Sequence, residues 1–232
     1  MYGPSVSFQL SRVPLIEPPE AKLLFNQALM LEFAFNRVES RRNFEHVVRL
    51  SPRCALCWWG VARSYSSNIN HDIENYTLFN EVAARALAEL RPEDGPKVSM
   101  MVHSMQHLRV PGAMGNGTKA LVNASRHALA EHLCANHTTD ADVAALCADA
   151  LMTTSPWDYY DGPRLKAIME PAWEYLRRDV SPSRAPHPLS LHLFIHLAEP
   201  STYDLNSPLI GQLAADALDG MVRGAGHLDH MA

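Results

Sequence analysis

The sequence predicts an all-α chain, and more narrowly tetratricopeptide-like helical hairpins that form a curved α-solenoid. Apolar residues recur at spacings of three and four along most of the chain, which is the period of an amphipathic helix. No convincing run with the alternating pattern of a strand is present. The third observation is an internal repeat in the N-terminal third, which favours helical hairpins over a bundle.

The expected organisation is an extended N-terminal segment over residues 1–20, followed by one helical-repeat domain over 21–232. Helical periodicity together with proline and glycine breaks predicts about eight to ten helices. Pro171 lies inside one of them and should kink it or start a fresh turn. The expected helices span 21–40, 41–50, 55–68, 80–90, 98–108, 118–134, 140–152, 164–178, 189–199 and 207–222.

The repeat is clearest when Pro52 is placed at the proline that ends a tetratricopeptide unit of about 34 residues. Phe44 then occupies the aromatic position of that unit and Ala28 its small-residue position. One period later, Trp58 and Tyr65 take the two aromatic positions around a small Ala62. Beyond residue 70 the period weakens, so the later helices are expected to form hairpins of irregular length.

Composition excludes several classes of function. The net charge of −5 and the pI near 6.2 argue against a nucleic-acid partner, which would need a basic face. No apolar run is long enough to span a membrane. The N-terminus lacks the charged start and apolar core of a signal peptide, so the expected location is cytoplasmic or left open.

Cysteines and glycosylation sequons give the same expectation. Four cysteines in a chain of this length do not suggest a disulfide framework. The CxxC pair, Cys54 and Cys57, lacks the preceding strand of a thioredoxin-like site and is interpreted as helix packing. Without a signal peptide the sequons are expected to stay unmodified, although they would count in a secreted protein. They begin at Asn75, Asn116, Asn123 and Asn136.

The most informative segment is the histidine-rich end of the chain. His192, His196 and Glu199 follow the spacing i, i+4, i+7, which places them within about 60° of one another on a helix. His227 and His230 lie three residues apart near the terminus. Imidazoles and a carboxylate on one helix face could bind Zn²⁺, Fe²⁺ or Cu²⁺, with Glu199 as a fifth ligand or a proton acceptor.

The alternative for these histidines is helix packing. Apolar side chains surround His192 and His196, so the helix over 189–199 is expected to be buried nearly all round. Histidines in such a helix often only satisfy hydrogen bonds. The segment is not HExxH, because Phe194 and Ile195 lie between the histidines, so the base of a zinc protease is absent.

Four other patterns are interpreted as structural. His103 and His107 also have the i, i+4 spacing but no carboxylate in phase. Residues 112–119 lack the order of a phosphate-binding loop and predict a plain loop. The segment 157–161 predicts a turn between helices, with a ligand pocket and Asp158 as a partner for a histidine N–H as the alternative. Residues 68–71 predict a helix-ending turn.

Four separated blocks, at 25–70, 140–158, 192–201 and 224–231, resemble in order a family of tetratricopeptide-like proteins that are mostly bacterial and algal. The resemblance implies the repeat fold and says little about activity. In that family the last block is followed by a proline-containing turn, a further histidine and more repeats. The chain is therefore expected to be the N-terminal portion of the family pattern, or a shortened relative, without the last ligand.

Two functions remain open from the sequence. The first is a binding scaffold whose concave groove holds a peptide or protein partner, with a possible metal site. The second is a metal-dependent enzyme of unknown substrate that uses the histidines described above.

Overall fold

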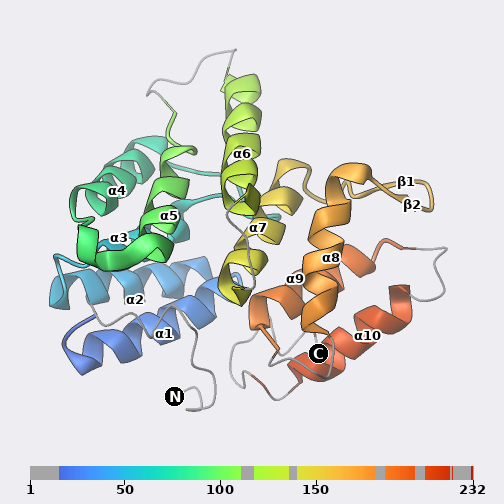
Figure 1. Ribbon diagram of the computed structural model, residues 1–232, viewed down its shortest axis with the longest axis horizontal. Coiled ribbons are helices and arrows are strands. Elements are labelled where there is room, and N and C mark those ends of the chain that lie inside the picture. Colours follow the sequence, from blue (N-terminus) through green and yellow to red (C-terminus); the bar gives the residue numbers. More distant parts are fainter. Residues whose placement is uncertain are drawn as a thin grey trace.

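The computed structural model describes residues 16–110, 118–135, 140–180, 186–201, 207–219, 221 and 231. This part of the chain is mostly helical, as the periodicity predicts (Figure 1). Two short 3₁₀ turns, η2 (Pro92–Asp94) and η3 (Ala167–Met169), precede α5 and α8. The helices are α1 (Pro19–Phe33), α2 (Arg37–Leu50), α3 (Ala55–Tyr65), α4 (Tyr76–Ala88), α5 (Gly95–Gln106), α6 (Thr118–Ala135), α7 (Ala141–Thr154), α8 (Glu170–Asp179), α9 (Pro188–Ala198) and α10 (Ser207–Leu218).

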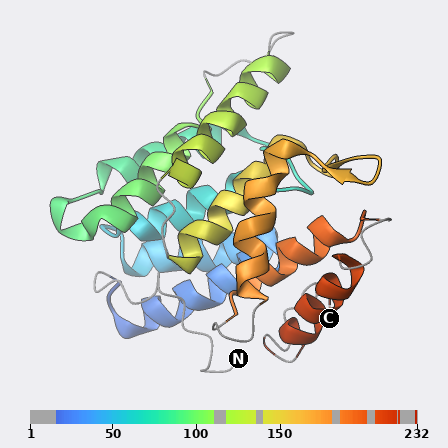
Figure 2. The same ribbon diagram turned by 45° about the vertical axis from the view of Figure 1, so that its right-hand side comes forward.

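Most helices pack on their neighbours in sequence, from α1 against α2 to α9 against α10. Figures 1 and 2 show α1 to α5 stacked on one side of the molecule and α8 to α10 on the other, with α6 and α7 between them. A further contact joins α1 to α9, at opposite ends of the chain. An open solenoid, in which each unit touches only its neighbours, does not require this contact. It brings the end of α1 to the helix that carries the histidine pair.

Three residues of the repeat register lie in the core between α1, α2 and α3, while Trp58 and Tyr65 are only half-buried against it. Phe44 is fully buried, and Ala28 and Ala62 are fully buried at the close approaches of the helices. A methyl group at Gly60 would collide with the Phe44 ring, so α3 can lie this close to α2 only with glycine at that position. Burial at these positions is compatible with many helical folds, so the repeat and the solenoid both stay predictions.

The first predicted helix boundary is wrong. A single helix was expected over 21–40, but α1 ends at Phe33 and α2 begins at Arg37. The break occurs because Phe35 adopts a left-handed backbone conformation, with φ of 55°. The Asn36 side chain then accepts a hydrogen bond from the Glu39 N–H and caps α2. Helix α1 also begins at Pro19, inside the segment expected to be extended; residues 1–15 lie outside the described part.

The region around Pro171 differs from the predicted helix bounds, although Pro171 does start a fresh turn, one of the two expected outcomes. In place of one helix over 164–178, a two-stranded antiparallel hairpin pairs β1 (Tyr160–Asp161) with β2 (Arg164–Leu165), and α8 starts only at Glu170. Pro171 therefore lies in the first turn of α8, where a missing N–H breaks no hydrogen bond. The expectation of no strands missed this hairpin because its strands are too short to show a period.

The cysteines give a clear correction. Disulfides join Cys54 to Cys57 and Cys134 to Cys147, with Cα–Cα distances of 5.2 and 4.9 Å, so none of the four cysteines is a thiol. Cys54 is the residue before the first turn of α3, which brings Cys57 back beside it. The second bridge ties α6 to α7, and its pairing depends on how these helices pack. Cys54 and Cys57 are both buried, as expected for residues with a packing role, but the bond between them was not expected.

Replacing Cys134 and Cys147 together by alanine is expected to lower the free energy of unfolding by about 3 kcal/mol, because that bridge closes a longer loop of the unfolded chain. The sequence separation is 13 for this bridge and 3 for the bridge between Cys54 and Cys57. Urea unfolding monitored by circular dichroism measures the change. Equal destabilisation by the matched Cys54→Ala, Cys57→Ala variant would contradict this reasoning.

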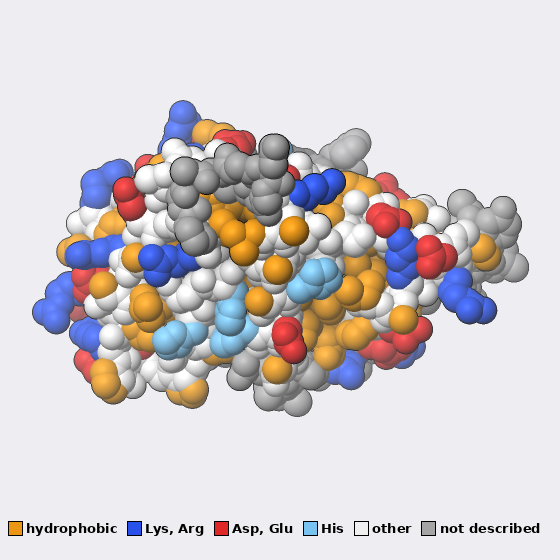
Figure 3. Space-filling model, turned by 90° about the horizontal axis from the view of Figure 1, so that it is seen from above, with side chains coloured by type: hydrophobic (Ala, Val, Ile, Leu, Met, Phe, Trp, Pro, Cys, Tyr) orange, Lys and Arg blue, Asp and Glu red, His pale blue; other side chains and the backbone are white. Residues whose placement is uncertain are grey.

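The described surface mixes charges of both signs. On the face in Figure 3, basic and acidic side chains are interspersed with apolar ones and do not merge into one basic surface. This distribution and the net charge of −5 give no support to a nucleic-acid partner. Within the described ranges, no helix has both the length and the apolar character needed to cross a bilayer.

Candidate metal centre

Helix α9 carries the first histidine pair and is the most buried helix in the described structure, with every residue from Pro188 to Ala198 buried. Its start is fixed by His187, whose Nδ1 accepts a hydrogen bond from the Ser190 N–H at 3.4 Å. His187 Nε2 therefore carries the proton and donates to Asp142 Oδ1 on α7 at 3.1 Å. Lys97 on α5 contacts the other oxygen of Asp142 at 2.6 Å. This chain of contacts sets where α9 begins.

The predicted face of α9 brings two imidazoles together. His192 Nε2 and His196 Nε2 lie 3.1 Å apart, and the two side chains are 0% and 5% exposed. The other ring nitrogen of each histidine has a partner that can only accept. His192 Nδ1 donates to the Phe33 carbonyl at 2.7 Å, and His196 Nδ1 donates to Glu199 Oε2 at 3.1 Å.

These partners fix the tautomers of both rings. A neutral imidazole has one N–H, and in each ring the acceptor places it on Nδ1. In a neutral ring of this tautomer Nε2 is the nitrogen that can accept a hydrogen bond or bind a metal, and the two Nε2 atoms lie 3.1 Å apart. That distance is a hydrogen-bond contact in which a proton on one Nε2 is shared with the other, and a bound cation could take the place of that proton. This arrangement, with the second nitrogen held by a carbonyl or a carboxylate, is typical of histidines that ligate a metal.

The first outer partner, the Phe33 carbonyl, is available because of how α1 ends. The Asn36 N–H bonds the Leu31 carbonyl at 2.8 Å and the Phe35 N–H bonds the Glu32 carbonyl at 3.0 Å. This is the Schellman pattern, in which the left-handed residue is usually glycine. Here it is Phe35, and the Phe33 carbonyl at the helix end accepts from His192.

The aromatic ring at that unusual position lies on the histidine pair. The Phe35 ring centroid is 4.3 Å from that of His192, and the Phe35 ring is stacked on His196 at 6.3 Å. A phenylalanine in the left-handed region costs about 1–3 kcal/mol relative to its ordinary conformation. The ring forms one wall of the site, and its contacts help to hold that conformation.

A second aromatic residue repeats this arrangement from the other side. Trp157 has φ of 62°, and the Asp158 N–H bonds the Ser155 carbonyl at 3.1 Å across it. With Pro156 before it, Trp157 takes the place that glycine or asparagine usually fills in a type II turn. Its ring meets His196 edge-on at 5.1 Å between centroids. Phe35 and Trp157 are the two non-glycine residues with positive φ among those described, and both contact His196.

The predicted ligands divide into three groups. His192 and His196 come together as the spacing predicts. Glu199 lies beside His196 and accepts its Nδ1 proton, so it takes the part of a proton acceptor and holds the ring. His227 and His230 lie outside the described residues. Within the described part, no group of three or more His, Cys, Asp or Glu side chains is gathered in a way that could hold a metal ion.

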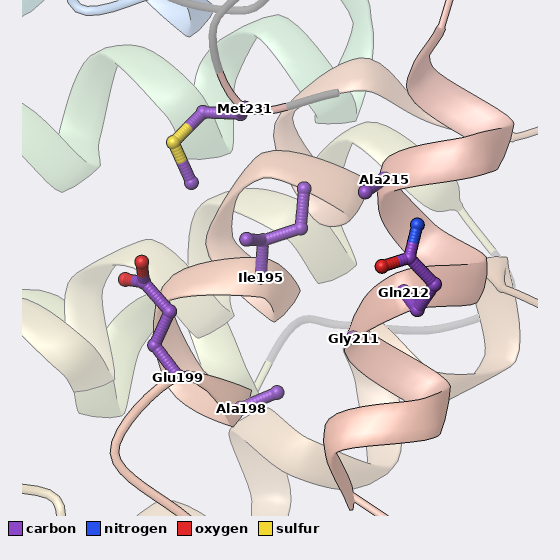
Figure 4. Close-up of a pocket in the computed structure, with 7 residues that line it drawn as sticks. All are labelled: Ile195, Ala198, Glu199, Gly211, Gln212, Ala215 and Met231. Atoms are coloured by element: carbon purple, nitrogen blue, oxygen red, sulfur yellow. The ribbon is translucent and has the colours of Figure 1, made fainter.

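Next to Glu199, a cleft of about 320 Å³ opens between α9 and α10 (Figure 4). Its walls come close because Gly211 faces Ala198, where an added Cβ would lie 3.1 Å away. Figure 4 shows the Glu199 carboxylate and the Met231 thioether on the same side of the cleft, around Ile195. The lining residues are Ile195, Ala198, Glu199, Gly211, Gln212, Ala215 and Met231.

The other sequence patterns lie in helix ends, turns and loops. His103 on α5 and His107, the residue after its end, are both exposed; partial desolvation lowers the pKa of the His107 ring, as does the nearby His132 ring. Asn68 and His71 form a tight turn after α3, as predicted. The predicted loop over residues 112–119 lies largely outside the described part, although Thr118 begins α6 as expected.

Asp158, considered as a partner for a histidine N–H, instead forms an ion pair with Lys166 at 2.5 Å. The carboxylate that accepts from His196 is that of Glu199. Within the segment 157–161, the residue that contacts this histidine is Trp157.

The contacts of Asp142 predict a loss of stability in acid. Burial alone would raise its pKa, but the hydrogen bonds and charges of His187 and Lys97 outweigh burial and lower it below its usual value. A carboxyl with a lowered folded-state pKa stabilises the fold above the unfolded value of about 3.9, and that contribution is lost as the pH falls below it. Asp142→Asn should be less stable at neutral pH and should lose less further stability between about pH 5 and pH 2. Urea unfolding at several pH values measures this, and parallel pH profiles would contradict it.

Comparison with known proteins adds no assignment: no protein-family model, no curated protein and no solved structure matches this chain. The resemblance to tetratricopeptide-like proteins therefore stays a prediction from the sequence, and the site is interpreted from its own geometry.

Proposed function

We propose that this protein binds a divalent transition-metal ion, with His192 and His196 as two of its ligands through Nε2. The observation that carries the proposal is the pair of Nε2 atoms 3.1 Å apart, each in a ring whose Nδ1 lies at hydrogen-bond distance from a carbonyl or a carboxylate oxygen. If a metal lay about 2.0–2.2 Å from both nitrogens, the angle between them at the metal would be about 90–100°. That angle fits the four- to six-coordinate geometries of Zn²⁺, Fe²⁺ and Cu²⁺.

The surroundings support the same proposal. Two aromatic residues are held in backbone conformations that usually require glycine, and both rings lie against His196. Such strain tends to persist at functional sites, where the surrounding structure compensates it. An apolar wall around imidazole ligands also limits solvent access and thereby influences metal affinity.

We propose His227 and His230 as the further ligands. The support is their residue type and spacing in the sequence, together with the place of Met231, which follows His230 and lies in the cleft beside Ile195 and Glu199. Glu199 would orient His196 rather than bind the ion. The bound metal would supply Lewis acidity, or activate water, if it has an open coordination position.

Binding of a peptide in a concave groove, the other function expected from the sequence, has no comparable observation behind it among the described residues. A metal-dependent enzyme of unknown substrate, the second function expected from the sequence, likewise remains an alternative. The proposal is therefore limited to holding the ion.

The test is metal stoichiometry in matched variants. In His192→Asn, His196→Asn, the asparagine amide can still donate where Nδ1 does, while Nε2 is removed. The wild-type chain, dialysed against Zn²⁺ and then buffer, should retain about one ion per chain by elemental analysis, and the variant should retain none. The control His103→Ala, His107→Ala removes an exposed pair with the same spacing and should leave the metal content unchanged.

Two outcomes would overturn the proposal. In the first, the wild-type chain retains none of Zn²⁺, Fe²⁺ or Cu²⁺. The two rings would then share a proton and not a metal ion. The other is equal metal content in the wild type and the asparagine variant. Circular dichroism of the variant separates loss of a ligand from loss of the fold.

A further inference from the structure

A second set of residues, away from the metal centre, bears on where the chain matures. Every cysteine in the 232-residue chain is in a disulfide, and the two bridges lie in different parts of the fold. In reducing compartments glutathione and thioredoxin keep most cysteines as thiols, whereas paired cysteines are usual in secreted proteins.

The two bridges differ in how protected they are. Cys54 and Cys57 are buried at the start of α3, but Cys134 is only half-buried near the C-terminal end of α6. A small thiol could reach the bridge at Cys134, so that bridge would persist only where the surroundings are oxidising. The pairing of all four cysteines thus argues for an oxidising compartment.

The two sequons in the described part begin at exposed asparagines, which a glycan could reach. Asn123, in Asn123-Ala-Ser125, is exposed in the N-terminal half of α6. Figures 1 and 2 show that the N-terminal half of this helix stands away from the neighbouring helices. The exposed Asn123 side chain leaves room for a bulky substituent on the solvent side.

Asn75, in Asn75-Tyr-Thr77, is also exposed, although it has a structural role. Its Oδ1 accepts the Leu78 N–H at 3.0 Å and caps α4. A glycan is attached to the amide nitrogen Nδ2, so the cap and the modification use different atoms of one side chain. The other two sequons, at Asn116 and Asn136, lie outside the described residues.

We propose that this chain matures in an oxidising secretory compartment and carries N-linked glycans at Asn75 and Asn123. In the modification, C1 of an oligosaccharide leaves its lipid pyrophosphate donor and bonds to Nδ2, which loses one proton; the lipid pyrophosphate is the leaving group. Each cysteine pair loses two protons and two electrons to a disulfide oxidant of that compartment. This replaces the cytoplasmic location that the sequence suggested, and it is independent of the metal proposal.

The test uses the protein isolated from the cells that make it. One portion is denatured without reductant, treated with N-ethylmaleimide and analysed by peptide mass spectrometry; none of the four cysteines should carry the label. A second portion is treated with a peptide N-glycosidase in ¹⁸O-water, and Asn75 and Asn123 should then appear as ¹⁸O-labelled aspartate. Maleimide on the cysteines would overturn the assigned compartment. Intact disulfides with no ¹⁸O label at either asparagine would overturn the assigned glycans.

A variant series separates specific attachment from other causes of added mass. In cells that secrete the chain, Asn123→Gln should lose the mass of one glycan, and Asn75→Gln should lose another. Asn43→Gln, at an asparagine on α2 that begins no sequon, should change nothing. An unchanged mass in both sequon variants would overturn the proposal, whatever the metal content of the protein.

Discussion

Replacing Arg63 by methionine is expected to lower the free energy of unfolding by about 3–5 kcal/mol at neutral pH, because it leaves buried charges without their partner. Arg63 on α3 is 4% exposed, and its Nη2 lies 2.5 Å from Asp149 Oδ2 on α7. Its Nε lies 3.6 Å from Glu32 Oε1 on α1. One buried cation therefore lies between two buried carboxylates and ties three helices together, while Arg37 adds a second positive charge near Glu32.

The pH dependence of this variant tests the cause of its loss of stability. Burial raises the pKa of both Glu32 and Asp149, and the charge of Arg63 opposes this effect. Without Arg63, both folded-state pKa values should rise further. Stability in Arg63→Met should then be greatest below the unfolded value of about 4 and should fall as the pH rises towards 8, because ionisation favours the unfolded chain.

The measurement is urea unfolding from pH 4 to pH 8 for the wild type and Arg63→Met. A second variant, Arg63→Met with Asp149→Leu, removes one of the two stranded carboxylates and should recover part of the loss. A constant difference between wild type and Arg63→Met across this range would show that packing rather than charge is responsible.

The spacing of apolar residues predicts a helix well where the helix continues for as long as the apolar spacing does. The spacing of apolar residues predicts α6 and α9 to within a residue or so. It fails at Phe35, because an apolar residue in phase gives no sign that the backbone turns left-handed there. The pairing of Cys134 with Cys147 is equally hidden, since it depends on how α6 lies on α7.

The site is predictable only in its local part. The spacing of His192, His196 and Glu199 follows from helix geometry alone, and the structure brings these three side chains together. The acceptor that fixes His192, the Phe33 carbonyl, lies 159 residues away in sequence, and main-chain acceptors leave no mark on composition. The aromatic residue at 157 was noted as part of a possible pocket, but its contact with His196 depends on the turn conformation.

Replacing Trp157 by glycine is expected to lower the affinity for Zn²⁺ by about 10-fold or more, with only a small loss of stability. Trp157 is 47% exposed, so its removal sacrifices less burial than a core aromatic would. Glycine also accepts the positive φ of 62° at no steric cost. The ring lies edge-on to His196, and without it solvent reaches the ligand that Glu199 holds.

Trp157→Ala is the matched control, because it also removes the ring but keeps a Cβ in the left-handed region. The alanine variant should bind Zn²⁺ as weakly as the glycine variant. It should be less stable than the glycine variant by about 1 kcal/mol, the typical cost of that backbone conformation for a residue with a Cβ. Chelator-competition titrations give the affinities and urea unfolding gives the stabilities. If both variants bind Zn²⁺ like the wild type, Trp157 has no part in the metal centre; a loss of affinity in alanine alone would attribute the effect to the backbone rather than the ring.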